Sequence, residues 1–247
     1  MKISVITVCY NSAATIADTL DSVAQQSWPQ VEHIIIDGAS TDGTLNIVKS
    51  RGERVTRFVS GPDKGIYDAM NKGIAMATGD VIGLLNADDV YADADVLSRV
   101  AQKFEDSNVE AVYGDVVFFK PENPDKIIRR YNSGRFSPDK LAWGWMPSHP
   151  ALFLRREVYA RVGPFNTSYR IAGDFDFIIR AFGSGQLRYE YIPEVWVKMR
   201  AGGISTGGLR NTLLLNKEVL QSCRNNGIKT NIFKILSKYP AKLLEFI

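Results

Sequence analysis

The stretch VEHIIIDGASTDGT, residues 31–44, decides the fold. Its first part, Val31–Ile36, is apolar and rich in β-branched residues, as expected of a parallel strand covered on both faces, and it ends at Asp37. Ser40–Gly43 then carries residues that begin helices, and we expect the helix to continue through Val48. A buried strand, a polar turn and a helix in this order predict one unit of an α/β sheet.

The same unit recurs on both sides of this stretch. We expect further strands at Ile3–Cys9, Val55–Val59, Val81–Leu85 and Val109–Tyr113, and helices at 16–27, 66–79 and 96–104. Ser12 is interpreted as the N-cap of the first helix, and Asn11 and Asp42 are also interpreted as caps. Alternation up to residue 115 predicts a mostly parallel, twisted sheet that is flanked by helices and connected by right-handed crossovers.

The pattern changes beyond residue 115. We expect an antiparallel pair at Val116–Phe119 and Ile127–Arg130, a loop at 131–150, a strand at Ala151–Arg155, and helices at Phe175–Phe182 and Leu209–Cys223. The prediction is one domain of two halves, 1–115 and 116–205, in which the second half holds a small antiparallel portion. C-terminal helices form an extension at 206–247.

Composition narrows the class of protein. The 247 residues are 45% hydrophobic and 23% charged, which is ordinary for a soluble globular chain, and a net charge of +3 predicts no nucleic-acid partner. Cys9 and Cys223 form no disulfide framework and fit a reducing cytosol. With only His33 and His149, a histidine-rich zinc site is not expected. No run approaches the ~20 apolar residues that span a bilayer, so a cytoplasmic protein is expected.

Polar clusters follow three of the expected strands. Tyr10-Asn11 follows the first strand, Asp37 ends the second, and Asn86-Ala87-Asp88-Asp89 follows the fourth. Ligands of open parallel sheets bind beyond the carboxyl ends of the strands, where these clusters converge. Asp and Asn also cap helices, but the positions of Asp37 and Asp88 at strand ends favour ligand binding.

Four segments in this order resemble glycosyltransferase family 2: residues 3–12, 36–44, 63–73 and 85–89, with a weaker similarity at 145–180. The resemblance implies the GT-A fold and transfer of a sugar from a nucleoside diphosphate, with a UDP-sugar favoured. Its acceptor would be a hydroxyl of a glycan or a polyprenyl-linked glycan, as in surface polysaccharide biosynthesis. Residues 1–115 would form the nucleotide-sugar half, and residues 116–205 the acceptor half.

The resemblance also implies which residues hold the nucleotide. They are Thr7, Cys9, Tyr10, Asp37, Asp63, Lys64, Asn86 and Ala87. A carboxylate such as that of Asp37 suits the donor groups of a base or ribose, and an aromatic ring such as that of Tyr10 can stack on a base. At residue 38 this chain has glycine where many relatives have a second aspartate.

Asn86-Ala87-Asp88 occupies the Asp-x-Asp position of the family. Mn²⁺ or Mg²⁺ is the implied cofactor, because a hard cation is held by one or two carboxylates together with substrate phosphates. It would offset the charge on the departing diphosphate. Asp88 is the first metal ligand and Asp89 the second. For Asp89, a role as the cap of the next helix is an equally good interpretation.

The acceptor hydroxyl needs a base, and the segment Ala172–Phe177 resembles the part of the family that supplies it. On this resemblance Asp174 is the catalytic base, Gly173 replaces the usual glutamate, and Asp176 points elsewhere. One base and one metal site suit a single inverting displacement. Trp145 and His149 are candidate acceptor-binding residues, with packing roles as the alternative.

The tail beyond Gly227 has Lys234, Lys238 and Lys242 at four-residue spacing, with apolar residues opposite them. These apolar positions are Ile232, Ile235, Leu236, Tyr239, Leu243 and Phe246. Pro240 predicts two short helices in place of one long helix. They either contact the inner face of the membrane peripherally or pack on the domain with the lysines in water.

Two other functions compete with the glycosyltransferase. A sugar-1-phosphate nucleotidyltransferase would need a glycine-rich loop after the first strand, and residues 8–12 contain no glycine. A non-catalytic protein that binds nucleotide sugars draws support from Asn86 and Gly173, where residues typical of the family are missing.

Overall fold

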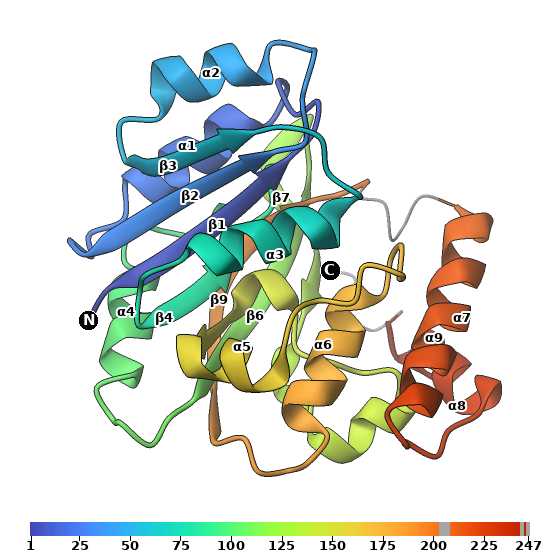
Figure 1. Ribbon diagram of the computed structural model, residues 1–247. Helices are drawn as coiled ribbons and strands as arrows, with labels where there is room; N and C mark the ends of the chain where they lie inside the picture. Colours follow the sequence, from blue (N-terminus) through green and yellow to red (C-terminus); the bar gives the residue numbers. More distant parts are fainter. Residues whose placement is uncertain (203–207, 243–244, 246–247) are drawn as a thin grey trace.

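The computed structural model describes residues 1–202, 208–242 and 245, and within them nine strands join one sheet (Figure 1). The strands are β1 (Ile3–Cys9), β2 (Val31–Asp37), β3 (Val55–Ser60), β4 (Val81–Leu84), β5 (Asp89–Tyr91), β6 (Ala111–Lys120), β7 (Asn123–Tyr131), β8 (Leu152–Arg155) and β9 (Tyr189–Arg200). Their order is β3-β2-β1-β4-β8-β6-β9-β5, and β7 pairs with β6.

The first half of the sheet is parallel, as predicted. β1 pairs in parallel with β2 and β4, and β2 pairs in parallel with β3. Cys9 lies opposite Asp37, so the carboxyl ends of β1 and β2 coincide. The turn that follows β4 begins at the same edge. This alignment brings together the polar clusters that follow the strands.

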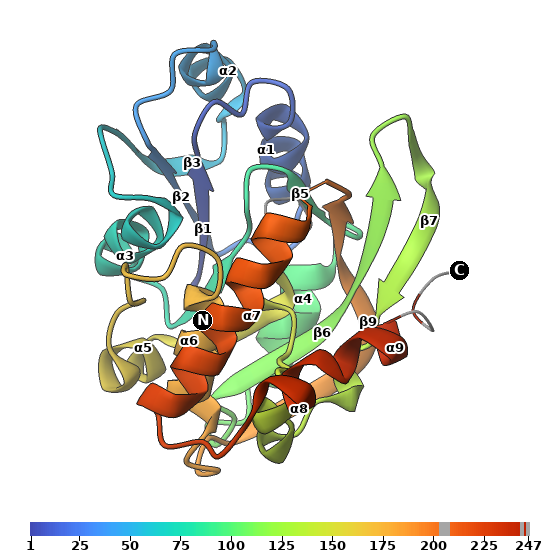
Figure 2. The same ribbon diagram turned by 90° about the vertical axis from the view of Figure 1, so that its right-hand side faces the viewer.

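Helices cover both faces of the sheet (Figure 1 and Figure 2). They are α1 (Ile16–Ala24), α2 (Thr44–Arg51), α3 (Ile66–Met76), α4 (Val96–Lys103), α5 (Arg156–Val162), α6 (Gly173–Phe182), α7 (Leu209–Asn225), α8 (Ile232–Leu236) and α9 (Lys238–Lys242). Ile34 and Ile36 pack in the core that includes α3 and α6, whereas Ile35 packs with α1 and α2. Both sides of β2 are therefore apolar, which explains its uninterrupted isoleucine run.

The second half differs from the prediction in one strand. The segments predicted as two strands, Val109–Tyr113 and Val116–Phe119, form the single strand β6. Gly114 lies within this strand, and a side chain there would come within 2.7 Å of the Trp196 ring, so close packing on Trp196 requires glycine. Residue 115, the predicted boundary between the two halves, lies inside β6, and the division into regions stays a prediction.

β8 lies antiparallel between β4 and β6, so the sheet is mixed in this region. The predicted antiparallel pair is present as β6 and β7, and the predicted strand at Ala151–Arg155 is β8. β5, β9 and α5 were not predicted from the sequence. β9 contains Pro193 and several charged residues, which obscure the strand pattern. The 131–150 loop contains the short 3₁₀ helices η1 (Ser133–Arg135) and η2 (Pro138–Trp143), and η3 (His149–Ala151) follows.

Two predicted helix caps were wrong. α1 begins after Thr15, not after Ser12, and the Ser12 amide donates to Thr44 Oγ1 at 2.8 Å. Asn11 has a left-handed backbone, with φ of 49°, and its Oδ1 accepts from the Thr41 amide at 2.9 Å. Both residues therefore tie the turn after β1 to the turn after β2. Asp42 does contact the first residue of its helix, since its Oδ1 accepts from the Thr44 amide at 3.1 Å.

The tail forms two short helices, α8 and α9, as predicted. The predicted division into an apolar and a lysine face was wrong, because Ile235 and Lys238 are both buried whereas Phe233 is 81% exposed. Leu243 and Phe246 lie outside the described residues. Within the described part of the chain, every helix is too short or too polar to cross a membrane.

Candidate active site

A cleft of about 790 Å³ lies at the carboxyl ends of β1 and β4. The turn after β1, the start of α3, the turn after β4, the β6–β7 pair and the end of β9 contribute to its walls. The predicted residues that line it are Cys9, Tyr10, Asp63, Asn86, Ala87, Asp88, Asp89, His149 and Asp174. Residues from the two halves of the chain thus share one cavity.

Three polar side chains form a continuous contact across this cleft. His149 Nδ1 lies 3.2 Å from Asp174 Oδ2, and His149 Nε2 lies 3.2 Å from Asn86 Nδ2. A neutral ring satisfies both contacts when Nδ1–H donates to Asp174 and Nε2 accepts from the Asn86 amide. The contact therefore orients the Asp174 carboxylate relative to the turn after β4.

Asp174 is the second residue of α6 and is held from its other side as well. Its Oδ1 accepts from the Phe175 amide at 2.8 Å and lies 3.5 Å from the Tyr67 hydroxyl. α6 begins at Gly173, so Asp174 is not the N-cap residue. A side chain at Gly173 would come within 2.7 Å of the Tyr67 ring. Glycine here lets Tyr67 pack beneath the first turn of the helix.

Asp88 and Asn86 line the cleft. Asp88 is half-buried and forms no hydrogen bond or ion pair with a described side chain, and Asn86 Oδ1 is buried without a hydrogen-bond partner in the described part of the chain. No three described His, Cys, Asp or Glu side chains enclose a metal by themselves. One or two protein oxygens that need phosphate oxygens to complete the shell fit a Mg²⁺ or Mn²⁺ ion.

Asp89 is a poorer ligand than Asp88. It lies in β5 and is 1% exposed. Burial, and then the charge of Asp88, raise the pKa of its carboxyl well above the ordinary value, which favours the protonated form. The alternative in which Asp89 caps the next helix was wrong, because α4 begins after Asp95.

Asp37 lies behind the cleft and does not line it. Its carboxylate is fully buried and accepts from the Ser40 amide and hydroxyl, from the Ser60 hydroxyl at 2.7 Å and from the Cys9 thiol at 3.6 Å. Burial alone raises the pKa of this carboxyl, but the hydrogen bonds outweigh it and the pKa is lowered. In this arrangement Asp37 is a charged anchor for the strand ends.

Asp63 takes the position that Gly38 leaves open. A side chain at residue 38 would come within 2.6 Å of Asp63 Oδ2 and within 3.4 Å of the Tyr10 ring. Asp63 therefore supplies a carboxylate beside Tyr10, whose side chain is 66% exposed. Residue 38 is glycine in this chain, and the carboxylate next to it comes from Asp63, in the turn after β3.

Besides Asp37, three predicted residues do not line the cleft. Thr7 is fully buried, and its hydroxyl lies 3.1 Å from His33 Nε2. Lys64 is exposed outside the cleft, where its amide donates to Asp68. Trp145 is half-buried against Tyr131, with the ring centres 6.3 Å apart.

The sequence analysis missed several residues that line the cleft: Tyr67, Arg170, Phe118, Ile128, Met199 and Arg200. Tyr67 lies in the 63–73 segment that carries the family resemblance, which was a usable signal. Phe118, Ile128 and Met199 had none, because they reach the cleft through pairing of β6 with β7 and β9.

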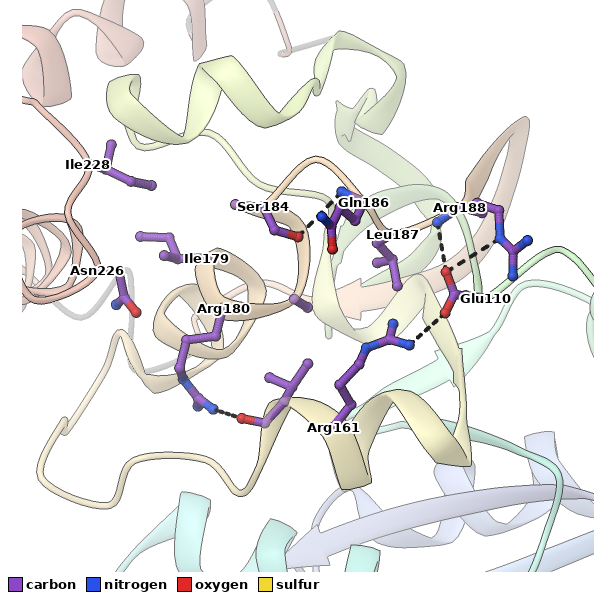
Figure 3. A pocket seen from close by; sticks show the side chains of 13 residues that line it. Glu110, Arg161, Ile179, Arg180, Ser184, Gln186, Leu187, Arg188, Asn226 and Ile228 are labelled. Atoms are coloured by element: carbon purple, nitrogen blue, oxygen red, sulfur yellow. Dashed lines mark hydrogen bonds and ion pairs between the residues drawn. The ribbon is translucent and has the colours of Figure 1, made fainter.

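A second cavity, of about 830 Å³, lies at the opposite end of α6 from Asp174 (Figure 3). Figure 3 shows its charged groups paired with one another, since Arg161 and Arg188 both reach Glu110. Arg180 donates to the Val162 and Pro164 carbonyls. None of the predicted site residues lines this cavity, so the cleft at the strand ends is the candidate active site.

The fold is the GT-A fold of glycosyltransferases. The crystal structure of S. aureus TarS matches with a TM-score of 0.69 at 18% identity, over 98% of this chain and 43% of that one. The mannosyltransferase PcManGT from Pyrobaculum calidifontis, in complex with GDP-Man and Mn²⁺, matches with a TM-score of 0.68 at 24% identity, over 96% of this chain and 68% of that one.

The chain belongs to glycosyl transferase family 2, whose model matches residues 4–163. A PGL/p-HBAD biosynthesis glycosyltransferase of Mycobacterium tuberculosis is 37% identical over 226 residues, which are 88% of this chain and 82% of the relative. The chondroitin synthase of Pasteurella multocida is 30% identical over 193 residues, 76% of this chain and 19% of the synthase. The chain is therefore a glycosyltransferase and not a nucleotidyltransferase.

Variants of Asp37 and Asp63 separate an anchoring role from a nucleotide-binding role. We expect Asp37→Asn to lower the free energy of unfolding by about 3 kcal/mol, because it disrupts a buried charged network. Asp63→Asn keeps the acceptor for the Gly65 amide, so stability should hold while UDP binding weakens about tenfold or more. Thermal denaturation and calorimetry measure the two effects. Unchanged stability with lost UDP binding in Asp37→Asn would instead support direct contact of Asp37 with the nucleotide.

Proposed function

We propose that this enzyme transfers a sugar, with inversion, from a nucleoside diphosphate to a hydroxyl of a glycan or lipid-linked glycan, in surface polysaccharide or glycolipid biosynthesis. One observation carries the proposal: Asp88 and Asp174, from opposite halves of the chain, line one cleft. They are related through the contact of Asn86 with His149 and of His149 with Asp174. A leaving group on one side and a base on the other are what a single displacement requires.

Tyr10 and Asp63 are the proposed nucleotide-binding residues. The exposed Tyr10 ring can stack on a base, and the Asp63 carboxylate beside it can accept from base or ribose donors. Cys9 and Ala87 line the same part of the cleft. We favour a UDP-sugar as donor, since TarS 1-349 has been solved with UDP and with UDP-GlcNAc. PcManGT, solved with GDP-Man, makes GDP-sugars the competing donor class.

Asp88 is the proposed metal ligand, and the unpartnered Asn86 Oδ1 is the second oxygen on the same turn. A bound Mn²⁺ or Mg²⁺ would offset the negative charge that develops on the diphosphate as it leaves. The protein supplies few ligands here, which suits a cation that binds together with its nucleotide. Asp89 supports the turn from behind, where burial favours its neutral form.

Asp174 is the proposed catalytic base. As the acceptor oxygen attacks the anomeric carbon and the bond to the diphosphate breaks, the Asp174 carboxylate takes the hydroxyl proton. Its side chain is 14% exposed and is held by the Phe175 amide and by His149, so its orientation is set before substrate binds. One attack from the face opposite the leaving group inverts the configuration of the sugar.

The acceptor side of the cleft is partly apolar. Phe118, Ile128 and Met199 line it from β6, β7 and β9, and Arg170 lies near Asp174 along the chain. Apolar side chains beside a catalytic cleft suit an acceptor with a lipid or aryl portion, which supports the lipid-linked class. We keep His149 and Trp145 as acceptor-binding candidates, of which only His149 lines the cleft.

We also propose that the enzyme is cytoplasmic and contacts the inner face of the membrane through α8. Phe233 is 81% exposed and Leu236 is 41% exposed, and Lys229 and Lys234 lie beside them in sequence. Exposed apolar side chains with nearby cations suit the interface of an anionic bilayer.

Replacing Asp174 tests the base. We expect Asp174→Asn to lower kcat by about a hundred- to ten-thousand-fold, because the amide cannot take a proton, while the Kd for UDP changes little. The matched control Asp125→Asn, at an exposed position of β7, should keep full activity. Nuclear magnetic resonance of the wild-type product should show the anomeric configuration opposite to that of the donor. Near-normal turnover by Asp174→Asn, or retention of configuration, would refute the proposal.

Replacing Asp88 tests the metal site. We expect titration of UDP in calorimetry to show tighter binding with Mn²⁺ than with EDTA, and Asp88→Ala to remove that difference. Asp125→Ala should keep it. If Asp88→Ala still binds UDP more tightly with Mn²⁺, the cation is held elsewhere.

Replacing Phe233 tests the membrane contact. We expect the wild-type protein to sediment with vesicles that contain 30% phosphatidylglycerol, and Phe233→Glu to lose most of this binding. Gln221→Glu adds the same charge at an exposed position of α7 and should bind as the wild type does. Wild-type protein that stays in the supernatant, or equal binding by both variants, would contradict the proposal.

A further inference from the structure

α7 lies outside residues 4–163, the part of the chain that the family model matches, yet it packs beside the helix that carries Asp174. Both views show α7 next to α6 (Figure 1 and Figure 2), and Asp174, the second residue of α6, lines the cleft. The face of α7 that is turned inward carries Glu218 and Ser222. Asn226 directly follows the helix. None of these residues lines the cleft.

Glu218 accepts three backbone hydrogen bonds from one short segment. Its Oε1 accepts from the Arg170 amide at 2.9 Å, and its Oε2 accepts from the Ile171 and Ala172 amides, both at 2.8 Å. Ala172 is the residue directly before α6, and Asp174 follows two residues later. Three donors converging on one carboxylate define its position closely, because bonds to a charged acceptor are short and strong.

The same segment is held from the opposite side by α3. The Tyr67 hydroxyl donates to the Ile171 carbonyl at 2.5 Å, and the Tyr67 ring packs under Gly173. Residues 170–173 are therefore clamped between Glu218 of α7 and Tyr67 of α3. The first turn of α6 begins directly at this clamp.

A second contact joins α6 and α7 nearer the C-terminal end of each helix. Asp176 Oδ1 accepts from the Ser222 hydroxyl at 2.9 Å and from the Asn226 side chain at 3.3 Å. Asp176 also pairs with Arg180 one turn further along α6. These bonds hold the body of α6, whereas those of Glu218 hold only the segment that leads into it.

We infer that Glu218 is a positioning residue that sets the Asp174 carboxylate against His149. The inference rests on the proposed role of Asp174 as the base. Without the three bonds to Glu218, residues 170–172 and the first turn of α6 lose their support on the α7 side. The Asp174 carboxylate then shifts relative to His149. A displacement of about 1 Å at a reacting group can lower the rate by about a hundredfold.

The test is Glu218→Gln, which keeps the shape of the side chain but retains only one acceptor oxygen for three amides. We expect kcat to fall by about ten- to a hundred-fold while the Kd for UDP stays within about twofold, because the nucleotide residues lie on other elements. Hydrogen–deuterium exchange of a peptide that covers residues 168–176 should become faster. Lys217→Gln, at the exposed neighbouring position of α7, should change none of these quantities.

A further variant separates positioning from general stability. Ser222→Ala removes a bond between α7 and α6 without touching residues 170–172, so it should lower the melting temperature with little change in kcat. Equal losses of kcat in Ser222→Ala and Glu218→Gln would overturn the inference. Full turnover by Glu218→Gln would also overturn the inference. If Asp174→Asn is inactive in the same experiment, the proposed function still stands. An active Asp174→Asn would instead remove the proposed function itself.

Discussion

The buried carboxylate of Asp37 joins the ends of three parallel strands, and the shape of the cleft depends on it. Asp37 ends β2, its neighbour Cys9 ends β1, and Ser60 ends β3. A charge removed from water must be satisfied by fixed donors, so the three ends are held in one place. The Asp37 carbonyl also accepts from the Gly61 amide, at the start of the turn that carries Asp63. Tyr10 and Asp63 meet because this carboxylate sets the strand ends.

The antiparallel strand β8 then brings the second half of the chain to the same edge. Gly83 of β4 lies opposite Phe153 of β8. Because the strands run in opposite directions, residues just after β4 lie beside residues just before β8. Asn86 is thereby opposite the turn that contains His149, and their side chains meet at 3.2 Å. A parallel strand in this place would have carried His149 to the far edge of the sheet.

The chemistry is divided between the two sides of the cleft. In the proposed reaction, Asp88 and Asn86 act on the diphosphate from the turn after β4, and Asp174 acts from the start of α6. The proposed single displacement needs a leaving-group site and a base at separate positions, and these residues line one cleft from different elements. Helix α7 contributes indirectly, since Glu218 accepts from the backbone amides of residues 170–172, directly before the helix that carries Asp174.

The sequence by itself determined the alternation of strands and helices up to α4, apart from β5, together with the family and the candidates Asp88 and Asp174. It could do so because these depend on periodicity within a segment and on motifs in order along the chain. Only the tertiary structure decided that Asp37 faces inward, that Asp63 takes the place opened by Gly38, and that Glu218 contacts the segment before α6. The pairing of β5 with β9 was equally beyond the sequence. Each of these depends on contacts between residues more than 20 positions apart, and a local pattern carries no information on which distant segment a side chain will meet.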